Sequence, residues 1–216
     1  MSRNETESSS EKNATTDNLA QAVAVLKQGD IIVFPTETLY GLGADALNDA
    51  AVDKVFHLKG RDRDNPIPVL VADESMLLTL VAEISPAATK LMRCCWPGPL
   101  TLVLPARKGV PKPLVNSAGG IGVRISNHAI ASQLVTALGR PLTATSANPS
   151  GKQAARTVME ARAYFTDQVK VFVDGGTLTS KTGSTVVELL GDSLKIIRGG
   201  EISLADLERI LSEDGP

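Results

Sequence analysis

The spacing of apolar side chains predicts an alternation of helices and strands along most of this chain. Leu19, Val23 and Leu26 recur at helical spacing and Gly29 follows them, so we expect a first helix that ends at this glycine. Residues 30–34 then form a short apolar run that is typical of a buried strand. The same patterns predict further helices at residues 49–58, 75–80, 86–93, 128–138, 157–165 and from 203, and further strands at 67–71, 100–104, 121–125, 141–144, 169–173, 184–189 and 194–198.

The order of these elements indicates a layered α/β protein of the α+β type. Helices that separate successive strands are expected to cover a sheet of about seven to eight strands. Strands 184–189 and 194–198 are joined by the hairpin-like residues 191–193, which favours mixed strand directions over an all-parallel sheet. Residues 35–43, which follow the first strand, are expected to form a loop. Without an internal linker or repeat, residues 19–216 are predicted to form a single domain.

Composition and charge exclude several classes of protein. The 22 Lys and Arg residues are balanced by 24 Asp and Glu residues, so nothing attracts the whole chain to nucleic acid or to an anionic membrane. No run of ~18 apolar residues could cross a membrane. The adjacent Cys94 and Cys95 predict neither a disulfide nor a zinc site. Residues 1–18 are apolar only at Met1 and Ala14, so we expect a disordered polar tail without a signal peptide, on a cytoplasmic protein.

Two tripeptides combine the side chains that a phosphate-bearing small molecule requires. Lys59-Gly60-Arg61 opens a charged run, and Ser146-Ala147-Asn148 follows an apolar, strand-like segment. Ammonium and guanidinium groups neutralise phosphate charge, while a hydroxyl and an amide fix its orientation. We expect the two tripeptides to lie on opposite walls of one pocket, although each alone would also fit a solvated loop.

Known phosphate-binding loops are absent, so side chains must hold any nucleotide. Neither GxxxxGK[ST] nor GxGxxG occurs after the first strand. Arg124 interrupts an apolar strand, where it could instead lie on a solvated sheet face or pair with a core carboxylate. Arg198 ends another strand, where solvent exposure is the alternative. Thr36, Thr38 and Tyr40 follow the first strand, at the edge where α/β sheets bind ligands, and would suit a polar zwitterion such as an amino acid.

Together these segments resemble the YrdC/Sua5 family, whose members make L-threonylcarbamoyl-AMP. The matching segments run in family order: Phe34–Gly43, Lys59–Arg61, Asp64–Pro66, Trp96–Thr101, Val123–Ile125, Ser146–Asn148, Ser150–Gly151, Ser184–Val186 and Ile197–Gly199. The resemblance implies a three-layer, YrdC/RibB-like fold around a twisted mixed sheet. It also implies a nucleotidyltransferase that converts L-threonine, bicarbonate and ATP into threonylcarbamoyl-AMP and pyrophosphate. The product would pass to the machinery that forms t6A at position 37 of tRNA.

The resemblance also implies a role for individual residues. The catalytic residues would be Lys59 and Arg61. The ATP-binding residues would be Arg61, Asn65, Ser146, Asn148 and Arg198. The threonine-binding residues would be Thr38, Arg124 and Ser184. Mg²⁺ would arrive with ATP, because no carboxylate cluster predicts a metal bound by the protein itself.

Two positions depart from the family pattern, and two other functions stay open. Leu70 stands where family members often have His, and Gly120 where they often have Thr. The chain resembles the short, single-domain form. One alternative is a paralogue that handles another carbamoyl-adenylate. The other is a non-catalytic RNA-binding module, which the low aromatic content and the net charge of −2 disfavour, with weak RNA contact remaining as an accessory property.

Overall fold

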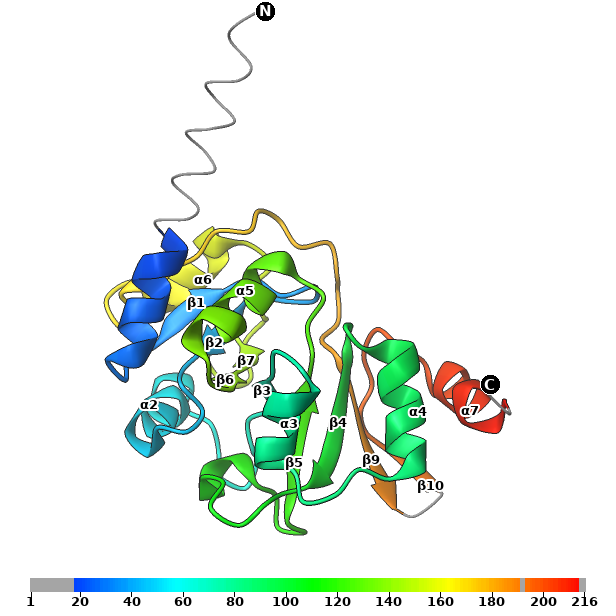
Figure 1. Cartoon of the computed structure of the whole chain (residues 1–216). Coiled ribbons are helices and arrows are strands. Elements are labelled where there is room, and N and C mark those ends of the chain that lie inside the picture. The colour runs from blue at the N-terminus through cyan, green and yellow to red at the C-terminus, as the bar shows by residue number, and fades with distance from the viewer. Residues whose placement is uncertain (1–17, 191–192, 214–216) are drawn as a thin grey trace, which may run out of the picture.

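The computed structural model describes residues 18–190 and 193–213 (Figure 1). Within the described residues, the first helix covers 18–27, so it includes residue 18 of the predicted tail. The rest of the predicted disordered tail, residues 1–17, lies outside the described residues, as do residues 191–192 of the predicted hairpin.

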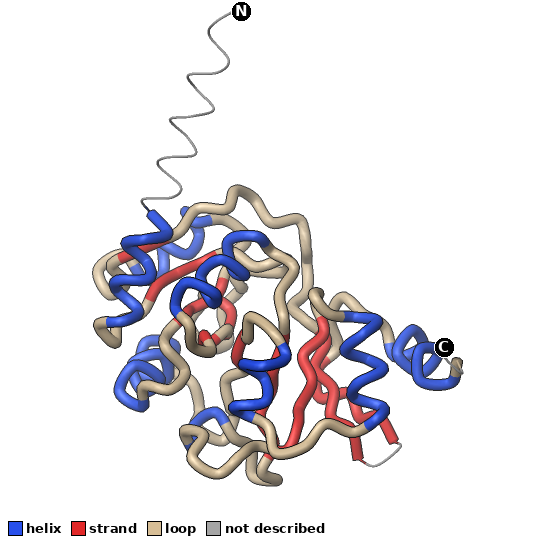
Figure 2. The backbone as a smooth tube through the Cα atoms, in the orientation of Figure 1, coloured by secondary structure: helices blue, strands red, loops and turns tan. Residues whose placement is uncertain are grey.

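The strands, drawn in red in Figure 2, form two mixed sheets. The four-stranded sheet has the order β7-β2-β1-β8 and consists of β7 (Thr145–Ser146), β2 (Gly41–Gly43), β1 (Ile32–Phe34) and β8 (Val171–Phe172). The six-stranded sheet has the order β10-β9-β4-β5-β3-β6 and consists of β10 (Ser193–Arg198), β9 (Thr185–Leu190), β4 (Leu100–Pro105), β5 (Gly120–Arg124), β3 (Val69–Leu70) and β6 (Leu142–Thr143). Parallel pairs (β1 with β8, β3 with β5, β4 with β9) accompany antiparallel ones, which confirms the mixed directions.

The prediction of one continuous sheet was wrong in detail, because the chain changes sheets at Ala144. The predicted strand 141–144 contains β6, which pairs with β3, whereas β7 begins directly after it and pairs with β2. The predicted loop 35–43 also contains β2. Its glycines carry no side-chain signal, yet they are required: a Cβ on Gly43 would lie 2.8 Å from the ring of Phe34.

The predicted helices are all present, and side-chain caps mark where several begin. They are α2 (Asp49–Lys59), α3 (Glu74–Leu80), α4 (Pro86–Cys95), α5 (Ala129–Leu138), α6 (Val158–Phe165) and α7 (Leu204–Ser212), with a 3₁₀ turn at Lys112–Leu114. Asn48, Asp73 and Ser85 each accept a hydrogen bond from a backbone N–H of the first turn of α2, α3 and α4. Thr157 and Glu160 form a full capping box on α6.

The four-stranded sheet lies between two helical layers, as the three-layer prediction requires. Ile32 and Phe34 pack in a smaller core with the first helix and α5. Ile31 and Val33 belong to the main core, with α2 and α6. Alternate residues of one strand are therefore buried on both faces, which explains its continuous apolar sequence.

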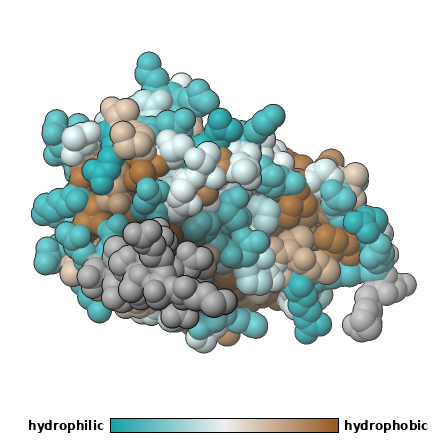
Figure 3. Space-filling model, turned by 90° about the horizontal axis from the view of Figure 1, so that it is seen from above, coloured by the Kyte–Doolittle hydropathy of each residue, from teal (hydrophilic) through white to brown (hydrophobic). Residues whose placement is uncertain are grey.

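Helices α3, α4 and α7 cover one face of the six-stranded sheet, while α5 covers the other face only at the end formed by β3 and β6. Leu102 and Val123 pack in the main core with residues of α3, α4 and α7, and Figure 1 shows α3 and α4 on the same side of the sheet. The opposite face carries small and polar residues, including Thr101 and Gly122, and borders a cavity. Hydrophilic side chains cover most of the surface seen in Figure 3. Among the described residues, no helix has both the length and the apolar content to cross a membrane.

Candidate functional site

Two cavities that share Arg198 contain most of the predicted site residues. The first, which we name the polar cavity, measures about 120 Å³. Its lining includes the predicted residues Thr38, Arg124, Ser146, Ser184 and Arg198. The second, which we name the sheet cavity, measures about 410 Å³ and lies on the face of β4, β5 and β9 that is opposite to Leu102 and Val123. Its lining includes the predicted residues Arg61, Asn65 and Arg198.

Lys59 joins the two tripeptides directly instead of facing the second one across a pocket. It is the last residue of α2, and Gly60 ends the helix with the left-handed φ of 59°. The Lys59 ammonium donates hydrogen bonds to the carbonyl of Ser146 (2.6 Å) and to the carbonyl and side-chain oxygens of Asn148 (2.9 and 3.0 Å). Only 3% of Lys59 is exposed. The prediction of opposite walls was therefore wrong for Lys59, because its ammonium holds the second tripeptide in place.

Burial also changes the protonation of Lys59. Removal from water, together with the positive charges of Arg61 and Arg198, lowers its pKa to about 7. An anion bound beside these groups would oppose that shift, because it stabilises the charged ammonium. The site is thus a local concentration of positive charge on a chain whose net charge is slightly negative.

The loop after α2 directs two arginines to different places. Arg61 donates hydrogen bonds to the carbonyls of Asn65 (2.6 Å) and Pro66 (3.3 Å), which fixes its side chain along the sheet cavity. Arg63 instead pairs with Asp53 at 2.9 Å and lies over the ring of Phe56. Of the two, only Arg61 therefore lines a cavity that contains other predicted residues.

The structure confirms one of the two alternatives given for Arg124, the pairing with a core carboxylate. Arg124 also lines the polar cavity. It is 5% exposed, and its Nη1 donates to Glu37 Oε1 at 3.0 Å, so it is paired with a carboxylate in the interior. Glu37 was missed by the sequence analysis. The available signal was an acidic residue within a loop otherwise rich in hydroxyls, between Thr36 and Thr38.

A chain of hydrogen bonds links Arg198 through Ser184 to Thr101 of β4. Arg198 Nη2 donates to the carbonyl (2.9 Å) and hydroxyl (3.0 Å) of Ser184, and that hydroxyl lies 2.9 Å from the hydroxyl of Thr101. A register shift in the β9–β10 pairing between Ile196 and Arg198 alters the course of the strand at this point. Thr101, which the sequence analysis placed only within a matching segment, lines the sheet cavity and is buried.

The three hydroxyl-bearing residues after β1 all line the polar cavity, and each hydroxyl also has a hydrogen-bond partner within the protein. Thr36 donates to the carbonyl of Leu39 at 2.7 Å and accepts from the N–H of Thr38 at 3.2 Å, so it closes the turn. Tyr40 donates to the carbonyl of Gly176 at 2.8 Å, and burial raises the pKa of its phenol to about 12. Thr38, whose hydroxyl lies 3.1 Å from that of Thr36, also lines the polar cavity.

The two departures from the family pattern have different structural consequences. Leu70 is 1% exposed and packs in the smaller core, so it lines neither cavity. Gly120 lines the sheet cavity, where a Cβ would lie only 2.6 Å from Val103 Cγ1. A side chain at position 120 would therefore require Val103 to move.

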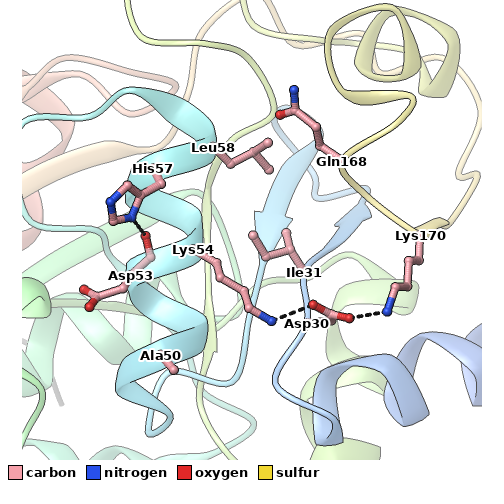
Figure 4. A pocket seen from close by; sticks show the side chains of 9 residues that line it. All are labelled: Asp30, Ile31, Ala50, Asp53, Lys54, His57, Leu58, Gln168 and Lys170. Carbon is pink, nitrogen blue, oxygen red and sulfur yellow. Dashed lines mark hydrogen bonds and ion pairs between the residues drawn. The ribbon is translucent and has the colours of Figure 1, made fainter.

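A larger cavity elsewhere has charges that neutralise one another. It measures about 630 Å³ and lies between α2 and the start of β1 (Figure 4). Asp30 accepts from Lys54 at 2.7 Å and from Lys170 at 2.6 Å, and none of the predicted site residues lines this cavity. Within residues 18–190 and 193–213, no group of three or more His, Cys, Asp or Glu side chains could hold a metal ion.

Comparison with known proteins gives concordant results. The Sua5/YciO/YrdC family model, described as telomere recombination, matches residues 24–200. Threonylcarbamoyl-AMP synthase of Pyrococcus abyssi is 36% identical over 89% of this chain, which spans 56% of that protein's length. Threonylcarbamoyl-AMP synthase of Thiobacillus denitrificans is 40% identical over 77% of the chain and 88% of its own length.

A solved structure also resembles the fold. Sua5 of P. abyssi complexed with L-threonine superposes with a TM-score of 0.86 at 36% identity, over 90% of this chain and 57% of that chain. The chain thus corresponds to somewhat more than half the length of the P. abyssi protein.

Proposed function

Because the chain belongs to the Sua5/YciO/YrdC family, we propose that it is an enzyme that makes L-threonylcarbamoyl-AMP from L-threonine, bicarbonate and ATP. The observation that carries this proposal is the convergence of Arg61, Arg124 and Arg198 on two cavities that meet at Arg198. A small polar cavity beside a larger, more apolar one suits an amino acid next to a nucleotide.

L-Threonine is assigned to the polar cavity. Arg124 is buried there and can bind a carboxylate through the N–H groups that Glu37 does not occupy. The hydroxyls of Thr38 and Ser184 line the same cavity and can bind the polar groups of the amino acid. The related P. abyssi protein has been solved in complex with L-threonine, which supports threonine as the amino acid that this chain would bind.

ATP is assigned to the sheet cavity and to the boundary with the polar cavity. Apolar side chains on the lining, including Pro68, Val186 and Ile197, offer a surface for the base. Arg61 and Asn65 lie along the same cavity, while Arg198 lies where it meets the polar one. The triphosphate would extend from Arg61 past Arg198 toward Ser146, which Lys59 and Asn148 support from behind.

This arrangement supports two successive chemical steps. The neutral amine of threonine attacks CO₂ and loses a proton, or attacks bicarbonate with loss of water, to form a carbamate. A carbamate oxygen then attacks the α-phosphorus of ATP, and pyrophosphate leaves. Adjacent cavities make the second step effectively intramolecular, which matters because the carbamate is short-lived in water. Arg61 and Arg198 would stabilise the charge that develops on the phosphate oxygens, and Lys59 would add charge while it holds Ser146.

The reaction makes the protein a nucleotidyltransferase whose metal ion comes with its substrate. Mg²⁺ would neutralise the triphosphate, in keeping with a site whose charged groups in the described chain are mainly cationic. The product would be used in the cytoplasm by the machinery that transfers the threonylcarbamoyl group to tRNA.

Pyrophosphate release tests the proposal. The protein is incubated with Mg²⁺-ATP, bicarbonate and L-threonine, and the adenylate product is identified by mass spectrometry. We expect release that depends on both threonine and bicarbonate, with L-serine as the matched control substrate. Release with another amine but not with threonine would support the paralogue alternative. RNA binding that survives Lys59→Ala and Arg61→Ala, without ATP binding, would support the RNA-binding alternative.

A further inference from the structure

Glu37 lies outside both cavities, yet it contacts a residue that lines one of them. We propose that Glu37 is the positioning residue of the threonine site: it fixes the Arg124 guanidinium so that the remaining N–H groups face the polar cavity. The inference rests on the proposed function and assigns a role to a residue that does not itself touch the substrate.

Both carboxylate oxygens of Glu37 are used by different parts of the chain. Oε1 accepts from Arg124 Nη1 at 3.0 Å, and Oε2 accepts from the hydroxyl of Ser126. Ser126 Oγ in turn accepts from the N–H of His128, the N-cap residue of α5, at 3.2 Å. The side chains of Glu37 and Arg124 are only 12% and 6% exposed, so solvent provides little competition for these bonds. These bonds therefore restrict rotation of the Arg124 guanidinium about the bonds of its side chain.

The ion pair also joins the two sheets. Glu37 lies in the loop between β1 and β2 of the four-stranded sheet, whereas Arg124 ends β5 of the six-stranded sheet. Thr38, the next residue after Glu37, lines the polar cavity together with Arg124. A contact that sets Glu37 relative to Arg124 thus also sets the spacing between two residues assigned to threonine.

Glu37 occupies a unique electrostatic position within the described part of the chain. Four cations gather at the site: Lys59, Arg61, Arg124 and Arg198. Among the described residues, Glu37 provides the only carboxylate that forms an ion pair with any of them. Its charge lets Arg124 stay buried before threonine binds. Because Glu37 bonds to Nη1, we expect Nε and Nη2 to be available to an incoming carboxylate.

Two conservative variants separate geometry from charge. Glu37→Gln removes the charge but can keep both hydrogen bonds, because the Ser126 hydroxyl can accept as well as donate. Glu37→Asp keeps the charge but withdraws the carboxylate by one methylene group, so it cannot reach both partners. Glu83→Gln, on an exposed residue, is the matched control.

Steady-state kinetics and a direct threonine titration by calorimetry test the inference on protein that circular dichroism shows to be folded. We expect Glu37→Asp to raise KM and Kd for threonine about tenfold with KM for ATP nearly unchanged, and Glu37→Gln to stay within about threefold of wild type. Equal increases in both KM values, a larger effect of Glu37→Gln, or a lower Tm with unchanged threonine affinity would each overturn it. A wild-type protein without threonine-dependent pyrophosphate release would instead overturn the proposed function, and the threonine titration would still report on Glu37.

Discussion

Lys59 and Asn148 lie 89 positions apart in the chain and are joined by two hydrogen bonds, of 2.9 Å to the carbonyl and 3.0 Å to the side-chain oxygen. The Asn148 amide nitrogen donates to the carbonyls of Pro149 (3.0 Å) and Lys152 (2.6 Å), which fixes the orientation of the amide. The end of α2 and the loop after β7 are therefore held together by one buried ammonium group.

Loss of this ammonium should affect stability and catalysis together. Lys59→Met removes the ammonium that donates to the carbonyls of Ser146 and Asn148, at a cost of about 1–3 kcal/mol in the free energy of unfolding. We expect the rate of threonine-dependent pyrophosphate release to fall at least ~100-fold, because Ser146 also loses its position. Lys54→Met, on the same helix but outside the site, is the control. Equal activities of the two variants would contradict the role of Lys59.

The depressed pKa of Lys59 predicts a dependence of stability on pH. Between pH 7 and the ordinary value of 10.5, the unfolded chain keeps a proton that the folded chain has released. The Lys59 contribution to the free energy of unfolding should therefore rise with pH across this window, by up to about 1.4 kcal/mol per pH unit. Urea unfolding of wild type and Lys59→Met at pH 7, 8 and 9 measures the difference, which removes the effect of other titrating groups. If the free energies of unfolding of wild type and Lys59→Met changed with pH in parallel, Lys59 would stay protonated in the folded chain.

Replacement of Arg198, the arginine shared by the two cavities, should weaken the binding of both substrates. Arg198 lines both cavities, whereas Arg124 lines only the polar one. We expect Arg198→Lys to raise KM for ATP and for threonine, each about tenfold, because lysine cannot reproduce the planar fork of N–H groups. Arg124→Lys should raise KM for threonine alone. The assignment of the two cavities would be wrong if Arg124→Lys raised only KM for ATP.

The glycines of β5 should control access to the sheet cavity. A Cβ on Gly122 would lie 3.2 Å from Pro68 Cβ and 3.4 Å from Thr101 Cγ2, which both line that cavity. We expect Gly122→Leu to fill the cavity and raise Kd for ATP at least ~30-fold, while threonine binding changes little. Gly122→Ala is the matched control and should show a much smaller effect. Calorimetric titration of both ligands measures the two outcomes, and unchanged ATP affinity in Gly122→Leu would place the nucleotide elsewhere.

The sequence predicted best those features that depend on neighbouring residues. The helix from 128 to 138 follows from its apolar spacing and from Gly139, and α5 occupies Ala129–Leu138. The run before Gly29 predicted the first helix equally well. The buried strand at 30–34 follows from its apolar residues alone, because both of its faces are covered by helices.

The site was predictable as a set of residue types but not as a set of contacts. Arg61 and Ser146 were identified from their chemical groups and the family pattern, and each lines one of the two cavities. Thr101 gave no separate signal, because a threonine within an apolar strand is common. Its importance depends on Ser184, whose hydroxyl lies 2.9 Å away although 83 positions separate the two residues.

By itself the sequence determined the helices and strands, the concentration of cations and hydroxyls, and the family pattern, since these depend on side-chain chemistry and on spacing within a few residues. Only the tertiary structure decided that residues 142–146 divide between two sheets, that Glu37 pairs with Arg124, and that Lys59 binds the second tripeptide. The physical reason is that hydrogen bonds between distant residues depend on the path of the whole chain, which no local pattern records.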